Sequence, residues 1–79
     1  MEPTKEEEIN QNIQDINKLH PCKLLLTKKE LATLRNVSVS TINREKAEGA
    51  GVVYKENRGQ IMYPVREIAI WLCNTIKTN

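Results

Sequence analysis

The side chains that could carry out chemistry are few and far apart in this sequence of 79 residues. There is one histidine, His20, and there are two cysteines, Cys22 and Cys73. A structural zinc site needs four ligands in recognisable pairs, and neither a two-histidine zinc motif nor a phosphate-binding glycine loop is present. The sequence therefore predicts no metal, no cofactor, no small-molecule ligand and no catalysis.

The basic side chains are unevenly distributed along the chain. Residues 1–20 carry two basic and five acidic side chains, a net charge of −3, whereas residues 21–79 carry ten basic and five acidic side chains, a net charge of +5. A basic segment is where a polyanion would bind. We therefore expect an acidic N-terminal part over residues 1–21 and a binding domain over residues 22–79.

Length and composition exclude several classes of protein. A chain this short forms one small domain, which buries only about 60% of the surface of its unfolded state. Hydrophobic residues make up 39% and charged residues 28% of the sequence, which favours a globular protein over a disordered one. No apolar run is long enough to cross a membrane, and the acidic N-terminus is unlike a signal peptide. We expect a cytoplasmic protein with reduced thiols and no membrane partner.

A first helix is predicted over residues 4–19. Thr4 and Glu7 have the spacing of a capping box, and Pro21 ends the helix because the residue before a proline avoids the helical region. Three isoleucines recur on one face of this segment. They cannot stabilise an isolated helix in water, so this face must dock on the same chain or pair with another copy.

Two short helices are predicted in close succession. One covers about residues 28–35 and begins with a second capping box, Thr27 and Glu30. The other covers about residues 38–48 and ends at a glycine. Asn36 lies between them and tolerates the left-handed conformation that a tight turn requires.

A hairpin and a last helix complete the chain. Residues 52–54 and 61–63 are strand-like and are separated by the polar segment 55–60, which predicts a β-hairpin with a basic, glycine-containing tip. Pro64 suits the first position of a helix over about residues 64–76. The expected fold is mainly helical with one small hairpin.

Residues 26–44, LTKKELATLRNVSVSTINR, resemble the small MerR-type winged helix-turn-helix proteins, which include phage excisionases and AlpA-like regulators. The resemblance continues with the basic hairpin tip Arg58-Gly59 and with Trp71 in the last helix, and it covers about residues 24–74. It implies a winged helix-turn-helix fold, a bacterial host cell, and an N-terminal helix outside the family core.

Three positions depart from the family pattern. Asn36 replaces the usual glycine of the turn, which its tolerance of the left-handed conformation allows. Glu45 and Lys46 stand where relatives usually have two apolar residues. We therefore expect the second half of the predicted helix over residues 38–48 to pack differently from that of the family, or the helix to end early.

The resemblance implies double-stranded DNA as the partner. The N-terminal hydroxyls of the second short helix would bind phosphates, its following residues would contact base edges, and lysines of the preceding helix and polar residues of the hairpin would contact the backbone. The residues that match these roles are Lys28, Lys29, Ser38, Ser40, Thr41, Asn43, Arg44, Lys55, Asn57, Arg58 and Gln60.

A domain of this size makes few base contacts. We therefore expect two or more copies to bind as a homodimer or a cooperative oligomer on DNA. The candidate dimer interface consists of Ile9, Ile13, Ile16, Ile70 and Cys73. The expected function is a sequence-specific phage or mobile-element regulator, or an excisionase, which would also contact a recombinase. The alternative is a protein-interaction adaptor or antirepressor that reuses the fold without binding DNA.

Overall fold

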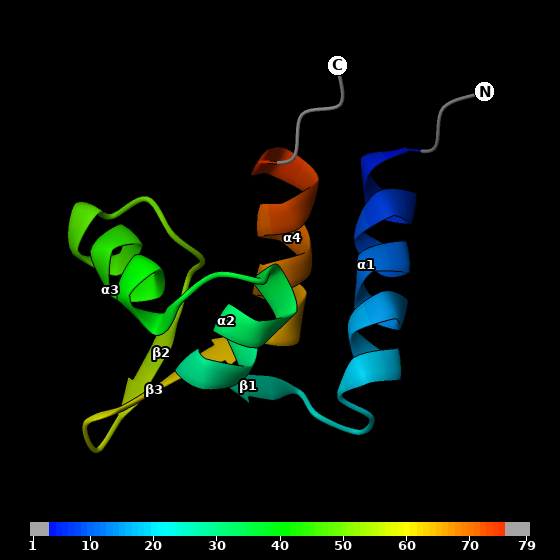
Figure 1. Ribbon diagram of the computed structural model, residues 1–79. Coiled ribbons are helices and arrows are strands. Elements are labelled where there is room, and N and C mark those ends of the chain that lie inside the picture. The colour runs from blue at the N-terminus through cyan, green and yellow to red at the C-terminus, as the bar shows by residue number, and fades with distance from the viewer. Residues whose placement is uncertain (1–3, 76–79) are drawn as a thin grey trace.

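The computed structural model describes residues 4–75, which form four helices and a small sheet (Figure 1). The elements in chain order are α1 (Lys5–Leu19), β1 (Leu25–Thr27), α2 (Lys28–Arg35), α3 (Val39–Glu48), β2 (Lys55–Asn57), β3 (Gln60–Pro64) and α4 (Val65–Thr75). The sheet is antiparallel, with strand order β1-β3-β2. The prediction of a mainly helical chain is confirmed, and the element order is consistent with a winged-helix-like layout.

Both predicted capping boxes are present. The hydroxyl of Thr4 accepts from the Glu7 N–H at 3.1 Å, and the Glu7 carboxylate accepts in return from the Thr4 N–H. Thr27 and Glu30 make the same reciprocal pair at the start of α2. These bonds satisfy amide groups that have no partner inside the helix. They explain why α2 begins at the predicted residue 28 and why α1 begins at Lys5, one residue after the predicted start, with Thr4 as its cap.

The Glu30 carboxylate makes α2 sensitive to acid. The Lys23 ammonium and the Thr27 N–H bind this carboxylate and lower its pKa from 4.5 to about 2. A depressed pKa gives stability that is complete above the ordinary value and is lost as pH falls through the folded-state value.

We therefore predict that Glu30→Gln lowers the free energy of unfolding at pH 6, and that its difference from the native chain disappears between about pH 4.5 and pH 2. Urea unfolding followed by circular dichroism at several pH values measures this. Glu48→Gln is the control, because Glu48 is exposed and forms none of the ion pairs found within residues 4–75. A Glu30→Gln deficit that persists unchanged at pH 2 would contradict the prediction.

The tight turn between α2 and α3 also forms as predicted. Asn36 has φ 58° and ψ 44°, and its N–H bonds to the carbonyls of Ala32 and Thr33. Ser38 then caps α3 through a bond from the Thr41 N–H at 3.2 Å. A left-handed residue that reverses the chain within two positions holds the two helices close together.

The hairpin differs from the prediction in register. Residues 52–54 are not a strand; β2 begins at Lys55, and Asn57 pairs with Gln60. The turn is only Arg58-Gly59, with φ of 54° and 81°, the pattern of a type I′ turn, which matches the twist of paired strands. Because so tight a turn pairs the residues next to it, the polar segment predicted as a loop supplies the strand.

Two further expectations at the sheet are corrected. The apolar segment before α2 contains β1, which pairs Leu25 with Pro64 and Leu26 with Tyr63 and so adds a strand to the expected hairpin. Pro64 ends β3, and α4 begins one residue later at Val65. The last predicted helical position, residue 76, lies outside the described residues.

Helix α1 docks on its own chain. Figure 1 shows α1 and α4 side by side and antiparallel, and Asn12 Nδ2 donates to the carbonyl oxygen of Ala69 at 3.1 Å. Ile16 is 2% exposed and belongs to the same core as Ile68 and Ala69. Burial of this isoleucine removes apolar surface from water and fixes α1 to the body.

The expected dimer interface is therefore wrong at Ile16, whose side chain is not available to a second copy. Ile9 and Ile13 are half-buried and pack against the core. Ile70 and Cys73 are also half-buried, and the Cys73 thiol donates to Glu8 Oε2 at 3.1 Å, a bond that raises the thiol pKa. Much of the predicted dimer interface is therefore covered by contacts within one chain.

Candidate nucleic-acid interface

Helix α3 presents one polar face to solvent. Ser40, Asn43, Arg44 and Ala47 are exposed, and their spacing places them on one side of a helix. Ile42, on the other side, is 2% exposed and lies in the core. In Figure 1, α3 lies on the opposite side of the molecule from α1. The outer face of α3 therefore combines a hydroxyl, an amide and a guanidinium, the groups that contact base edges and phosphates.

The start of α3 is organised by two hydroxyls. Ser38 Oγ and Thr41 Oγ1 lie 3.1 Å apart, and Ser38 Oγ accepts from the Thr41 N–H. Ser38 is exposed and Thr41 is half-buried. The first turn of α3 contains no acidic residue, whereas those of α1 and α2 do. The partial positive charge at the start of α3 is thus not compensated by a carboxylate in that turn.

The hairpin tip is the second exposed polar region. Asn57, Arg58 and Gln60 all face solvent. Arg58 adopts a left-handed conformation, with φ 54°, where local preference favours asparagine or glycine. A residue that is locally unfavourable at a turn is a sign of a role other than folding.

The remaining predicted residues occupy different surroundings. Lys29 is exposed and Lys28 half-buried in the first turn of α2. Lys55 is exposed at the start of β2, where it lines a groove with residues of α1 and α4. The predicted set therefore divides into the α3 face, the hairpin tip, the start of α2, and Lys55 beside a separate groove.

Acidic side chains are distributed unequally between the two sides of the molecule. Helix α1 carries four exposed carboxylates, Glu6, Glu7, Glu8 and Asp15. On α3 and β2 the exposed carboxylates are Glu48, at the end of the helix, and Glu56. The acidic helix is thus on the side away from α3 (Figure 1).

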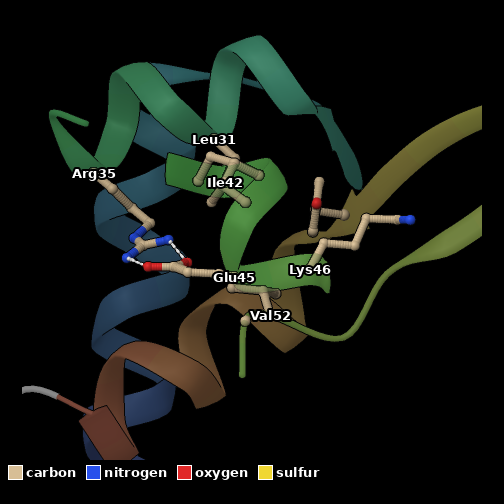
Figure 2. Close-up of a pocket in the computed structure, with 8 residues that line it drawn as sticks. Leu31, Arg35, Ile42, Glu45, Lys46 and Val52 are labelled. Carbon is tan, nitrogen blue, oxygen red and sulfur yellow. Dashed lines mark hydrogen bonds and ion pairs between the residues drawn. The ribbon is translucent and has the colours of Figure 1, made fainter. Parts of the chain in front are cut away.

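An ion pair holds α3 against α2. Figure 2 shows Arg35 of α2 and Glu45 of α3 pointing toward one another beside Leu31, Ile42 and Val52. The pair is bidentate, with Nη1–Oε1 2.6 Å and Nη2–Oε2 2.9 Å, and the two side chains are only 11% and 22% exposed. The Arg35 guanidinium lowers the pKa of Glu45. Paired and bidentate geometry offsets the cost of removing two charges from water.

The same guanidinium also contacts α4. Its carbon lies 4.1 Å from the centroid of the Trp71 ring, a cation–π geometry. Lys46, the next residue of α3, lies 4.9 Å from the ring centroid of Tyr54. Glu45 and Lys46 thus pack against Arg35 and Tyr54 respectively, and α3 continues to Glu48, so the alternative in which the helix ends early is wrong.

Neither Arg35 nor Trp71 was expected to position α3. The signal that could have indicated this role is the opposite charge of Arg35 and Glu45 on either side of the tight turn.

Within residues 4–75, no three histidine, cysteine or acidic side chains are grouped so as to hold a metal ion. The described helices include none with the length and apolar character needed to cross a membrane. Comparisons with protein-family models, with curated proteins and with solved structures gave no match to this chain.

Proposed function

We propose that this chain is a sequence-specific double-stranded DNA-binding protein of the winged helix-turn-helix type, without catalysis or cofactor. In this proposal α3 enters the major groove, and the β2–β3 hairpin contacts the flanking backbone. The observation that carries it is the outward face of α3, where Ser40, Asn43 and Arg44 are exposed together while Ile42 anchors the opposite face.

The dimensions and attachment of α3 suit this role. A major groove about 12 Å wide admits one helix, and α3 is a ten-residue helix attached to the body through its inner face. Small side chains, Ser40 and Ala47, flank Asn43 and Arg44 on the outer face. They allow the helix backbone to approach base edges closely enough for the two longer side chains to reach them.

The proposal divides its contacts into two classes. Lys29, the start of α3 and the hairpin tip would supply phosphate contacts, which give affinity that falls with salt. Asn43 and Arg44 would select the sequence. A mobility-shift or anisotropy titration on genomic fragments at two salt concentrations tests the proposal as a whole. Absent or salt-insensitive binding would favour the protein-interaction adaptor instead.

Arg44→Ala is expected to relax preference at one base position, at a cost of about 1–3 kcal/mol for the preferred base. Selection of bound DNA from a random library, carried out with both proteins, measures the change position by position. Lys29→Ala is the control, because loss of an exposed phosphate contact should weaken all sequences about equally. Unchanged affinity and unchanged preference in Arg44→Ala would show that α3 is not the recognition helix.

Arg58→Asn is expected to move stability and DNA affinity in opposite directions. Asparagine fits the left-handed turn position better, so the free energy of unfolding should rise by about 0.5–1 kcal/mol. Loss of the arginine should weaken all DNA sequences and reduce the slope of log affinity against log salt by about 0.9 for one lost phosphate contact. Thermal unfolding and titrations at several salt concentrations measure the two effects. A stabilised variant with unchanged DNA affinity would remove the hairpin tip from the proposed interface.

Within this proposal, a transcriptional regulator and an excisionase use the same DNA-binding surfaces. The excisionase role adds a contact with a recombinase, and either role calls for two or more copies on DNA. The docking of α1 leaves Ile16 out of any contact between copies. Selection of bound DNA also reports the spacing of half-sites, and thus whether copies bind side by side.

A further inference from the structure

We infer that a groove on the side of the molecule formed by α1, β1 and the start of α4 binds a short peptide segment of a partner protein. In this segment acidic residues alternate with apolar ones. The groove has a volume of about 520 Å³. It is lined by Ile13, Asn17, Lys23, Leu24, Leu25, Lys55, Pro64, Val65 and Arg66. None of these residues belongs to α2 or α3, so the groove is separate from the proposed DNA-binding helix.

The lining is largely apolar and continues onto exposed leucines. Leu24 is 83% exposed and Leu25 is 40% exposed, and both line the groove beside Ile13 and Pro64. Contiguous exposed apolar surface with a polar rim is a mark of an interaction site. Single exposed apolar residues are ordinary, but here two adjacent leucines extend a concave surface.

The charged residues of the lining are all basic. They are Lys23, Lys55 and Arg66, and the lining contains no carboxylate. Lys23 binds Glu30. Lys55 and Arg66 are exposed, and within residues 4–75 neither has a carboxylate at ion-pair distance. Two free cations beside an apolar floor are complementary to a ligand that carries carboxylates next to apolar side chains.

This combination favours a polypeptide over other occupants. Phosphates of DNA would match Lys55 and Arg66 but would leave Leu24 and Leu25 against a polar backbone. A small molecule would fill the groove without covering Leu24, which is largely exposed. A peptide segment with alternating acidic and apolar residues covers both the floor and the leucines and places its carboxylates at the rim.

Lys55 thereby acquires a role other than DNA binding. Its pairing with Met62, and the pairing of Leu25 with Pro64, place Lys55, Pro64 and Leu25 on the same face of the sheet. The opposite face carries Leu26 and Tyr63, which are buried in the core. Lys55 thus belongs to the outer face of the sheet together with the groove, and the chain could bind DNA and the peptide at once.

The test selects peptides from a random 12-residue phage-display library on the full chain and measures the affinity of synthetic, fluorescein-labelled versions by anisotropy. We expect enrichment of Asp or Glu next to Leu or Phe. Arg66→Glu and Leu24→Asp should each weaken the selected peptide about tenfold or more. Lys29→Glu and Val53→Asp are matched controls outside the groove, at exposed positions, and should leave peptide affinity unchanged.

DNA titrations of the same variants separate this inference from the proposed function, because Arg66→Glu and Leu24→Asp should leave DNA affinity within about twofold of the native chain. Circular dichroism checks that each variant is folded, and Arg66→Ala replaces Arg66→Glu if the latter is not. The inference is overturned if no peptide is enriched, if the enriched peptides lack acidic residues, or if the controls weaken binding equally. It is also overturned if sedimentation shows a dimer that Leu24→Asp abolishes, because the occupant is then a second copy.

Discussion

Ile16→Ala is expected to lower the free energy of unfolding by about 2–4 kcal/mol. Ile16 is 2% exposed and packs in the same core as Ile68 and Ala69, so alanine leaves a cavity between α1 and α4. For a domain whose total stability is about 0.05–0.15 kcal/mol per residue, this loss removes a large fraction of the whole. Urea unfolding followed by circular dichroism measures it.

Leu19→Ala is the matched control, because Leu19 is 64% exposed at the end of the same helix and its truncation should change stability by less than about 0.5 kcal/mol. The native chain should also unfold at the same temperature at low and high protein concentration. Stability that rises with concentration, combined with little effect of Ile16→Ala in dilute solution, would show that the isoleucine face contacts another copy instead.

The docking of α1 has a consequence for truncation. Removal of residues 1–20 takes Ile16 out of the core and uncovers the side of α4 that carries Ala69. The shortened chain should therefore lose stability by more than the single substitution. Its oligomeric state would then report on exposed core rather than on a native dimer interface, and the side-chain variants are the better experiment.

The local features of the fold could be predicted because their causes lie within a few residues. The capping boxes at Thr4 and Thr27 join groups three positions apart. The left-handed residues Asn36 and Gly49 end their helices through bonds to carbonyls three and four positions earlier. The starts of α1 and α2, and the tight turn before α3, therefore follow from sequence alone.

The sheet was less predictable because its register depends on distant pairing. Residues 52–54 have the composition of a strand, but Val52 is drawn into the core and the two-residue turn pairs the polar residues next to it. Strand β1 forms only because Leu25 and Leu26 meet β3 about 38 residues later. The isoleucine periodicity of α1 likewise indicated an apolar face, but not whether α4 or another copy covers it.

The candidate site shows the same division. The outward placement of Asn43 and Arg44 could be predicted, because the helical period separates them from the apolar Ile42. The support behind that face could not, because Arg35 and Glu45 are ten residues apart and meet only through the turn. Lys55 is a residue whose surroundings the sequence did not predict. Its position in the hairpin segment predicted a DNA contact, but the sheet register places it beside the groove.

Arg35→Met is expected to lower the free energy of unfolding by about 2–3 kcal/mol, less than the 3–5 kcal/mol typical of a fully buried pair, because Glu45 retains 22% exposure. The substitution leaves the Glu45 carboxylate without its partner and removes the guanidinium from the face of Trp71. Trp71 is the single tryptophan of the chain, so its fluorescence spectrum should change with the substitution. Urea unfolding monitored by that fluorescence measures both effects.

The double variant Arg35→Met with Glu45→Leu distinguishes the loss of an ion pair from the loss of packing. Replacing both charges with apolar side chains should recover most or all of the stability, because no carboxylate then remains unpaired in a largely buried position. If the pair orients α3 for DNA, Arg35→Met should weaken DNA binding and the double variant should restore it, although neither residue is on the exposed face of α3. If the double variant recovers stability but not DNA binding, the Arg35 guanidinium has a role beyond holding α3. If Arg35→Met alone is as stable as the native chain, α3 does not depend on this contact.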